Sequence, residues 1–246
     1  MPAILVTGAS RGIGAAIAGA LANAQFIVGC VSRTGKVPAL SFIEDAARAR
    51  LIPLQADVTD AASLQHAFSE CVRLGGQPIV GLGNNAGVHE ESRSHEMPRM
   101  QWDTVMNTNA LATVFGCQAA YPLLVSNGGG LIVNIGSFFD KLGVKRNLAY
   151  CASKAAVGAI TRVLGAEWAK VGIRVVDVAP GYIETDINRE SLAEGPLAKY
   201  LQARIPRGKP GTADEIAAFV AVLFTSNLGF LTGETIYIDG GQGHAH

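Results

Sequence analysis

The sequence predicts an α/β fold in which a doubly wound, seven-stranded parallel sheet is covered by helices on both faces. Short apolar runs alternate with longer amphipathic segments from end to end. Most of the short runs are continuous stretches of Val, Ile and Leu, a pattern typical of strands that are buried on both faces. The chain has 246 residues, of which 49% are apolar, so one domain of this length can bury a substantial core.

Each expected element follows from its hydrophobic period. The expected strands are Ala3–Val6, Phe26–Val31, Leu51–Gln55, Ile79–Leu82, Leu131–Ile135, Ile173–Val178 and Thr235–Ile238. The expected helices are Gly12–Ala24, Ala61–Leu74, Arg99–Val125, Tyr150–Val171 and Ala213–Phe224, with Asp60 and Thr212 as N-caps of the second and the last. Because helices alternate with strands, the strands should run parallel.

The domain organisation is expected to be simple. No repeat, low-complexity tract or long Pro/Gly linker divides residues 1–246, which we expect to form a single domain. The segment 186–211 has weaker periodicity, and Gly195, Pro196, Pro206 and Pro210 interrupt it. In a compact domain an irregular stretch of this length is usually a binding loop, so we expect a substrate lid at about 186–211.

Charge and cysteine content exclude several classes of protein. The 20 basic and 20 acidic side chains cancel, so no bulk field attracts nucleic acid or an anionic membrane. The first residues lack the pattern of a signal peptide, and the four cysteines form no Cys-x-x-Cys pair, which favours a reducing, cytoplasmic location. The five histidines form no ligand cluster, so no metal is expected.

A glycine-rich loop joins the first expected strand to the first expected helix. Gly8 lets the chain turn sharply, and Gly12 and Gly14 let backbone approach a pyrophosphate at the helix N-terminus. The spacing is Gly-x-x-x-Gly-x-Gly, and such a trio alone can be a tight turn that binds nothing. Its place between strand and helix predicts dinucleotide binding, with Ser10, Arg11 and Ile13 as further contacts.

The end of the second strand predicts NADP(H) in preference to NAD(H). Enzymes that bind NAD in such a fold carry an acidic residue about 20 positions after the glycines. Here the strand ends in Ser32-Arg33, and no Asp or Glu precedes Glu44. Arg11 and Arg33 are suited to a 2′-phosphate, since a guanidinium matches phosphate oxygens. The alternative is that Arg33 is a solvated surface residue.

Three polar residues in the second half of the chain form a candidate catalytic centre. Tyr150 and Lys154 are four positions apart at the start of an expected helix, so they share a face, and Ser137 follows the fifth strand. A free phenol has a pKa near 10, which an ammonium and an oxidised nicotinamide would lower. Tyr150 would then protonate a carbonyl oxygen, with Ser137 bonded to that same oxygen. By itself Tyr-x-x-x-Lys usually means two exposed residues.

Together these motifs resemble the classical short-chain dehydrogenase/reductase family across essentially the whole chain. The motifs are Thr7–Gly14, Asn84-Asn85-Ala86-Gly87, Ser137, Tyr150-Cys-Ala-Ser-Lys154, Pro180-Gly181 with Thr185, Thr232-Gly233-Glu234 and Asp239-Gly240-Gly241. The resemblance implies a Rossmann-type fold and an NADP(H)-dependent oxidoreductase. It also implies a homotetramer, which suits the Ala and Leu found on more than one face of two expected helices, Arg99–Val125 and Tyr150–Val171.

The resemblance also assigns roles to single residues. Asn109 falls where the family has a fourth catalytic residue, which holds a water that links the lysine to solvent; Asn107 is the alternative. The implied cofactor contacts are Asp57 and Val58 at the adenine, Asn84, Asn85, Ala86 and Gly87 beneath the cofactor, Tyr150 and Lys154 at the nicotinamide ribose, and Pro180, Gly181, Ile183 and Thr185 around the carboxamide and phosphates.

The substrate is less well indicated. The glycine loop and the segment 178–186 resemble 3-oxoacyl-thioester reductases, chiefly the 3-oxoacyl-[acyl-carrier-protein] reductases of fatty acid biosynthesis, so 3-oxoacyl reduction is the first expectation. Three features depart from that pattern. The segment 140–149 is bulkier and more charged, the segment 89–95 lacks Thr-Arg-Asp, and the turn 126–130 has no cation to dock an acidic acyl carrier protein.

Two alternatives therefore stay open. The first is an oxidoreductase of another ketone, a polyol or a sugar, with polar contacts from Ser92–His95 and Lys141–Asn147. The second is a dinucleotide-binding sensor without catalysis. The sequence disfavours a sensor because it retains Asn109, Ser137, Tyr150 and Lys154.

Overall fold

A computed structural model describes residues 1–38, 43–185 and 196–244 of the chain, and its centre is a sheet of seven parallel strands. The strands are β1 (Ala3–Thr7), β2 (Ile27–Ser32), β3 (Leu51–Gln55), β4 (Ile79–Asn84), β5 (Gly130–Ile135), β6 (Ile173–Pro180) and β9 (Thr235–Ile238). Their order is β3-β2-β1-β4-β5-β6-β9. The chain therefore winds outward from β1 first to one side and then to the other, which confirms the expected fold class.

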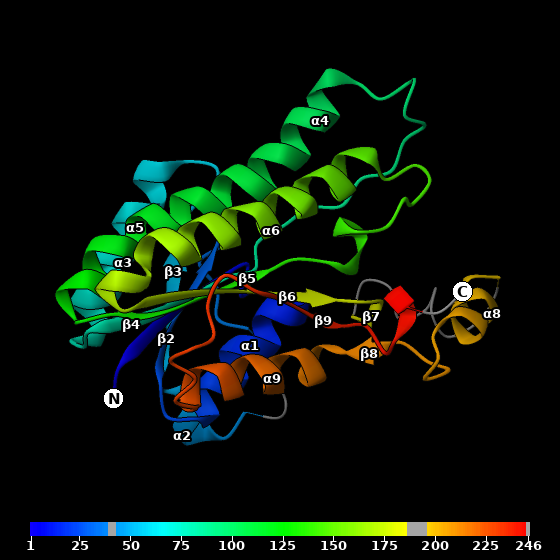
Figure 1. Cartoon of the computed structure of the whole chain (residues 1–246). Helices are drawn as coiled ribbons and strands as arrows, with labels where there is room; N and C mark the ends of the chain where they lie inside the picture. The colour runs from blue at the N-terminus through cyan, green and yellow to red at the C-terminus, as the bar shows by residue number, and fades with distance from the viewer. Residues whose placement is uncertain (39–42, 186–195, 245–246) are drawn as a thin grey trace.

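Helices cover both faces of the sheet (Figure 1). One layer holds α3 (Ala61–Gly75), α4 (Arg99–Met106), α5 (Ala112–Ser126) and α6 (Leu148–Trp168), and the opposite layer holds α1 (Gly12–Asn23), α2 (Asp45–Arg48) and α9 (Ala213–Thr225). Alternate side chains of β1 enter different cores. Ile4 and Val6 pack toward α1 and α9, while Ala3 and Leu5 pack toward α3 and α5.

Both expected N-caps are present. The Asp60 carboxylate accepts a hydrogen bond from Ala62 N at 3.0 Å. Thr212 and Glu215 form a reciprocal capping box, in which Thr212 Oγ1 accepts from Glu215 N at 3.2 Å and Glu215 Oε2 accepts from Thr212 N at 2.9 Å. These bonds satisfy amide groups that the first turn of a helix leaves free, so α3 and α9 begin where the sequence places them.

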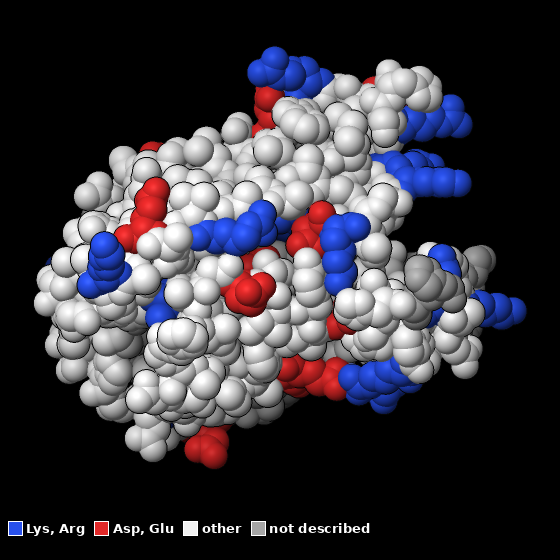
Figure 2. Space-filling view, viewed as in Figure 1, with Lys and Arg blue, Asp and Glu red and all other residues white. Residues whose placement is uncertain are grey.

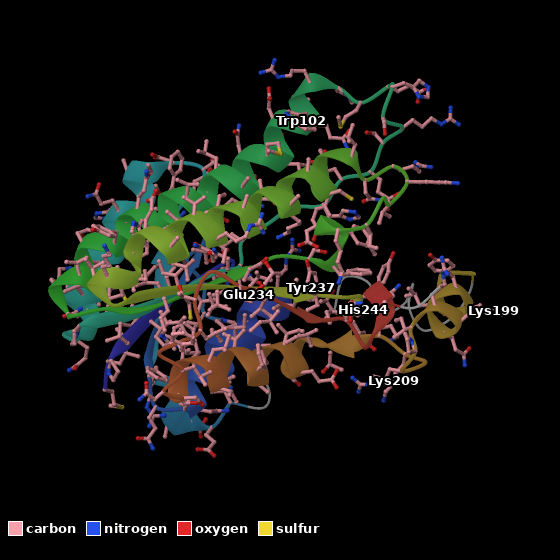
Figure 3. The ribbon with its side chains drawn as sticks, in the orientation of Figure 1. Trp102, Lys199, Lys209, Glu234, Tyr237 and His244 are labelled. Atoms are coloured by element: carbon pink, nitrogen blue, oxygen red, sulfur yellow. The ribbon has the colours of Figure 1, made fainter. Side chains whose placement is uncertain are left out.

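Several elements differ from the expectation, among them the short helix α2, which was not expected. The expected helix Arg99–Val125 is interrupted by a π-helical turn, Asn107–Leu111. Two short strands, β7 (Ile183–Glu184) and β8 (Gly211–Thr212), pair outside the main sheet. Of the expected lid, residues 186–195 lie outside the described residues, and α8 (Pro196–Arg204) follows them. The exposed Lys199 and Lys209 belong to the described part of this segment (Figure 3).

The surface has few charges. On the face shown in Figure 2, basic and acidic side chains both occur, and uncharged residues cover most of it. Among the described residues, no helix combines the length and apolar character needed to cross a bilayer, and no group of His, Cys, Asp and Glu could hold a metal ion. Cys30, Cys71 and Cys117 are buried free thiols, and Cys151 is half-buried.

Candidate active site

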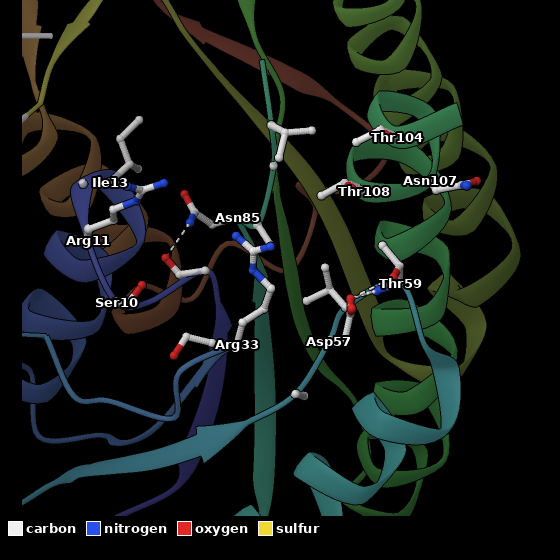
Figure 4. Close-up of a pocket in the computed structure, with 18 of the residues that line it drawn as sticks. Ser10, Arg11, Ile13, Arg33, Asp57, Thr59, Asn85, Thr104, Asn107 and Thr108 are labelled. Atoms are coloured by element: carbon white, nitrogen blue, oxygen red, sulfur yellow. Dashed lines mark hydrogen bonds between the residues drawn. The ribbon is translucent and has the colours of Figure 1, made fainter. Parts of the chain in front are cut away.

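A cavity of about 980 Å³ opens at the carboxyl ends of β1, β2 and β4 (Figure 4). Its position matches the point where the winding of the sheet reverses, between β1 and β4. Its volume is at the upper end of the range for ligand pockets. The residues that line it are Gly8, Ser10, Arg11, Gly12, Ile13, Ser32, Arg33, Ala56, Asp57, Val58, Thr59, Asn85, Ala86, Gly87, Val88, Arg99, Met100, Asp103, Thr104, Asn107, Thr108 and Thr185.

The glycines of the loop Thr7–Gly14 have different functions. Gly8 and Gly12 both have left-handed backbone, with φ of +66° and +56°. A Cβ on Gly8 would lie 2.9 Å from the Ala86 Cα, and one on Gly14 would lie 2.4 Å from the Gly8 carbonyl oxygen. A Cβ on Gly12 would meet only the Thr185 methyl, at 3.7 Å, and would enter the cavity. Gly12 therefore leaves open space at the start of α1, as a phosphate cradle would need, while Gly8 and Gly14 allow close packing.

Hydrogen bonds connect the two segments that form the floor of this cavity. Thr7 Oγ1 accepts from Asn85 N at 3.0 Å and from Ala86 N at 3.1 Å. The Asn85 side-chain amide in turn donates to the carbonyls of Thr7 and Gly8, at 3.1 and 3.3 Å. Because these bonds join the ends of β1 and β4, the glycine loop and the segment Asn85–Gly87 are held together as one surface.

Three arginines, Arg11, Arg33 and Arg99, and two carboxylates line the cavity. Arg11 and Arg33 are exposed, and neither forms an ion pair with any described residue. Asp57 accepts hydrogen bonds from Thr59 N at 2.9 Å and Thr59 Oγ1 at 2.7 Å. These bonds, aided by the charge of Arg33, lower the pKa of Asp57. Asp103 pairs with Arg99 at 2.8 Å. The residues present thus fit a dinucleotide with a further phosphate near Arg11 and Arg33.

Several expected cofactor contacts do not line this cavity. Asn84 is 6% exposed and donates instead to Asn134 Oδ1 at 3.0 Å and to the Thr113 carbonyl at 3.3 Å. Its side chain joins β4 to β5 and α5, so it does not reach the lining of the cavity. Further expected residues outside the cavity lining are Gly14, Tyr150, Lys154, Pro180, Gly181 and Ile183.

The three expected catalytic side chains come together beyond the end of β5. Ser137 caps the 3₁₀ turn Phe138–Asp140, and its hydroxyl hydrogen-bonds the Tyr150 side chain. The Lys154 ammonium lies 5.7 Å from the centre of the Tyr150 ring and donates to the Ile135 carbonyl at 2.7 Å. The shared face of α6 that the Tyr-x-x-x-Lys spacing predicts therefore points to the carboxyl end of β5.

The ionisation of this group differs from the expectation. Burial raises the pKa of Tyr150, and the hydrogen bond from Ser137 opposes that rise only in part. The expected lowering by Lys154 is wrong for the protein alone. Burial lowers the pKa of Lys154 to about 8, against the opposing charge of Asp177. Tyr150 is thus a neutral phenol at pH 7 and is ready to donate a proton.

The two candidate asparagines face different partners. Asn107 lines the large cavity. Asn109 is 1% exposed, and its amide donates to the Val88 carbonyl at 2.9 Å and to Ser153 Oγ at 3.0 Å, while its oxygen accepts from Val88 N at 2.8 Å. Ser153 directly precedes Lys154, so Asn109 joins the cavity wall to the catalytic helix. The π-helical turn is typical of a functional site.

Sequence reasoning missed the aromatic rim around Tyr150, which we define as His89, Phe138, Phe139 and Tyr182. The His89 ring lies 4.7 Å from the Tyr150 ring, and the Phe139 ring 5.8 Å from it, both edge-on. Tyr182 contacts Phe138 and Phe139, with ring centres 5.6 and 6.0 Å away. The available signals were the adjacency of His89 to the asparagine motif and of Phe138-Phe139 to Ser137.

The expected polar contacts to substrate are mostly used within the protein. Ser92 N donates to the Arg146 carbonyl at 3.0 Å, and Arg146 pairs with Glu91 at 3.8 Å. Asn147 Oδ1 forms a short hydrogen bond with His89 Nε2. Lys141 lies over the Tyr237 ring, 3.4 Å from its centre. The segments 89–95 and 141–147 therefore bind each other, and the part nearest to Tyr150 is the His89–Asn147 pair.

Comparison with known proteins agrees with this geometry. A family model described as "Enoyl-(Acyl carrier protein) reductase" matches residues 8–242. The 3-oxoacyl-[acyl-carrier-protein] reductase of Escherichia coli is 36% identical over 240 residues, which cover 97% of this chain and 96% of that protein. The NAD-dependent glycerol dehydrogenase of Listeria innocua is 31% identical over 238 residues, with 96% and 92% covered.

A solved structure has the same fold. It is a putative 2-deoxy-D-gluconate 3-dehydrogenase from Agrobacterium tumefaciens with bound NADP, with a TM-score of 0.87, 33% identity and coverage of 98% of this chain and 96% of that one. The matches span the glycine loop, the Ser137, Tyr150 and Lys154 cluster and the C-terminal strand. The chain therefore belongs to the short-chain dehydrogenase/reductase family, as an oxidoreductase that acts on CH–OH groups with a dinucleotide cofactor.

Proposed function

We propose that the protein is an NADP(H)-dependent carbonyl reductase and alcohol dehydrogenase. The observation that carries the proposal is the meeting of Ser137, Tyr150 and Lys154 at the end of β5, beside a cavity with a glycine cradle. A sensor without catalysis does not need a half-buried phenol bonded to a serine. Arg11 and Arg33 support NADP(H), since both line the cavity and no described carboxylate pairs with them.

The residues divide the work of a ketone reduction. Gly12, Arg11 and Arg33 would hold NADPH, which would supply the hydride when bound. Tyr150 gives its proton to the carbonyl oxygen, and Ser137 donates a hydrogen bond to that oxygen as negative charge builds on it. The Lys154 ammonium stabilises the phenolate that Tyr150 becomes. Asn109 is proposed to hold the water through which the proton is replaced.

A 3-oxoacyl thioester is the first candidate substrate. It is supported by the similarity to the Escherichia coli reductase and by the apolar part of the aromatic rim, Phe138, Phe139 and Tyr182. These rings offer an acyl chain an apolar wall next to Tyr150. Docking of an acyl carrier protein has weaker support, because the turn Ser126–Gly130 carries no cation.

Oxidation of a polyol or sugar is the second candidate. The similarity to a glycerol dehydrogenase and to a putative deoxygluconate dehydrogenase supports it. So does the exposed His89, which lies against Tyr150 and pairs with Asn147, because an imidazole can bond a hydroxyl group. The same residues would serve either direction, since the reaction is reversible at Tyr150.

We further propose that α8 is part of a lid and that the protein is a homotetramer. Leu201 and Ile205 are buried and pack on Tyr182, so movement of α8 would uncover the aromatic rim. The tetramer is supported by exposed apolar side chains on the layer of α5 and α6, among them Val125, Leu148 and Val163.

A substrate panel with a matched variant tests the function. NADPH oxidation is measured with acetoacetyl thioesters and unrelated ketones, and NADP⁺ reduction with polyols and sugar acids. We expect turnover with one class, and we expect Tyr150→Phe to lower its kcat by about 10³-fold because the proton donor is lost. NADPH affinity should change less than about twofold. Tight NADPH binding without turnover of any compound would support the sensor instead, and substantial turnover by Tyr150→Phe would remove Tyr150 from its role.

A further inference from the structure

A carboxylate is buried behind the catalytic residues, and the proposed reaction gives it no role. Asp177 lies on β6 with 0% exposure and points toward α6, as Val175 does two residues earlier. Its Oδ2 accepts a hydrogen bond from Thr235 Oγ1 at 3.1 Å. Its Oδ1 has no hydrogen-bond partner of good geometry among the described residues. A carboxylate in such a place is costly unless a positive charge compensates it.

Lys154 is the positively charged group that lies near the buried Asp177 carboxylate. Lys154 is 5% exposed and donates to the carbonyl of Ile135, the residue just before Gly136. The Asp177 carboxylate packs on Gly136, where an added Cβ would lie 2.5 Å from Oδ1. The two charged groups therefore both adjoin the peptide unit between Ile135 and Gly136, and both are shielded from water. Charges in such surroundings interact far more strongly than they do at the surface.

We propose that Asp177 is a positioning residue that acts through Lys154, as the buried counter-ion that keeps the catalytic ammonium charged. The inference rests on the proposed function only for the role of the Lys154 ammonium, which is to stabilise the Tyr150 phenolate. If Tyr150 becomes a phenolate, a charged Lys154 stabilises it, and Asp177 keeps Lys154 charged to a higher pH. Asp177 itself touches neither substrate nor cofactor in this proposal.

Asp140 and Tyr237 also lie near Asp177, and they bind each other. Tyr237 on β9 donates to Asp140 Oδ2 at 2.7 Å (Tyr237 is labelled in Figure 3). Gly158 on α6 makes room for the cluster: a Cβ there would lie 3.4 Å from Arg162 Nη1, 3.6 Å from Thr235 Oγ1 and 3.9 Å from Asp140 Oδ2. Arg162 and Lys141 thus lie on the Asp140 and Tyr237 side, toward the surface. Lys154 is the cation on the buried side.

Ionisation supports this pairing. Burial raises the pKa of Asp177 to about 6, and the charge of Lys154 opposes the rise while Asp140 adds to it. Burial lowers the pKa of Lys154 to about 8, and the charge of Asp177 opposes that fall. Both groups are therefore charged between pH of about 6 and about 8. Without Asp177, Lys154 would lose its proton at lower pH.

The first test is the pH profile of the Asp177→Asn variant. Asparagine has nearly the same shape and can keep the bond to Thr235. For the reductive direction we expect the alkaline limb of kcat/KM to move to lower pH by at least about half a unit, because Lys154 deprotonates sooner. Asp140→Asn is the matched control, since it removes a charge from the same cluster without adjoining Lys154. An unmoved limb in Asp177→Asn, or an equal shift in Asp140→Asn, overturns the proposal.

The second test needs no substrate and so separates this proposal from the proposed function. Unfolding free energies are measured for wild type, Asp177→Asn, Lys154→Met and the double variant. At pH 7 we expect Lys154→Met to change the unfolding equilibrium constant at least about tenfold more in wild type than in Asp177→Asn, and at pH 5 the difference should shrink as Asp177 is protonated. Additive effects at pH 7 overturn the pairing.

If Asp177→Asn fails to fold, the Lys154→Met variant alone still tests the pairing through the pH dependence of its stability. A raised carboxyl pKa gives stability that is present at low pH and is lost as pH rises through the folded value, because the folded state holds the proton longer. In wild type this loss ends near pH 6, whereas in Lys154→Met the unpaired Asp177 should extend it above pH 6. Parallel stability curves for the two proteins between pH 5 and 8 would contradict the proposal.

Discussion

Tyr150 shows how burial and charge compete at a single residue. The ammonium of Lys154 favours a phenolate, but it lies 5.7 Å from the ring centre and donates its hydrogen bond to Ile135 instead. Burial therefore raises the pKa of Tyr150 in the protein alone. A neutral phenol is the form that a ketone reduction consumes, so the resting site is prepared for reduction. Alcohol oxidation first requires that the phenol lose its proton.

Arg33 decides the cofactor in the proposed function. Arg33→Asp should lower the ratio of kcat/KM for NADPH to that for NADH at least about tenfold, since a charged hydrogen bond to phosphate contributes about 1.5–3 kcal/mol and the new carboxylate repels the phosphate. Steady-state kinetics with both cofactors measure the ratio. Lys36→Asp is the control, because Lys36 is exposed nearby but does not line the cavity. An unchanged ratio in Arg33→Asp would refute the 2′-phosphate assignment.

At the scale of single residues, the sequence predicts the features that depend on the spacing of motifs along the chain. The motif positions of Ser137, Tyr150 and Lys154 are enough to predict that they meet. The pKa of Tyr150 and the place of Asp177 depend on burial by distant segments, which no local pattern encodes. His89 is joined to Asn147 across 58 positions of sequence, so its contact with Tyr150 also arises only in the fold.

Whole elements follow their hydrophobic period where they are long. Every expected strand of the sheet is present, with ends moved by a residue or two, because continuous apolar runs fix the buried segments. The π-helical turn Asn107–Leu111 was not predictable in this way. Asn109 in this turn donates hydrogen bonds to Val88 after β4 and to Ser153 on α6. Both partners are distant in sequence, so a local sequence pattern does not reveal these bonds. The strands β7 and β8 have two residues each, which is too few to show a hydrophobic period.

The turn between β1 and α1 gives an element-scale prediction. Gly12→Ala should weaken NADPH binding at least about tenfold, because its Cβ enters the cavity where phosphate would lie. Gly76→Ala, at the end of α3, is a matched control with φ of +59° and nothing within 4 Å of the added Cβ. Both variants should lose about 1 kcal/mol of stability from the left-handed backbone. Calorimetric titration with NADPH separates the two, and equal affinity in both would contradict the cradle assignment.

For the molecule as a whole, the winding of the sheet brings the site together. The reversal between β1 and β4 opens the cofactor cavity, and β5 ends beside it with Ser137. The segments 89–95 and 141–147, which depart most from the acyl-carrier reductases, are bound to each other at one rim. Sequence comparison treats them as separate loops. In the folded chain they are one structure, so the substrate preference should change only when both are exchanged together.

Assembly is the prediction that concerns the molecular surface. Val163 on α6 is 54% exposed, and α5 and α6 lie next to each other in the outer layer (Figure 1). If a partner covers this layer, a carboxylate there would be buried without a counter-charge, and Val163→Asp should weaken association at least about tenfold. Light scattering after size-exclusion chromatography, at matched concentrations, measures the mass. Val72→Asp is the control, an equally apolar side chain that is 38% exposed on α3. We expect wild type and Val72→Asp to remain tetramers and Val163→Asp to give smaller species; a tetramer for all three would show that this face is free surface.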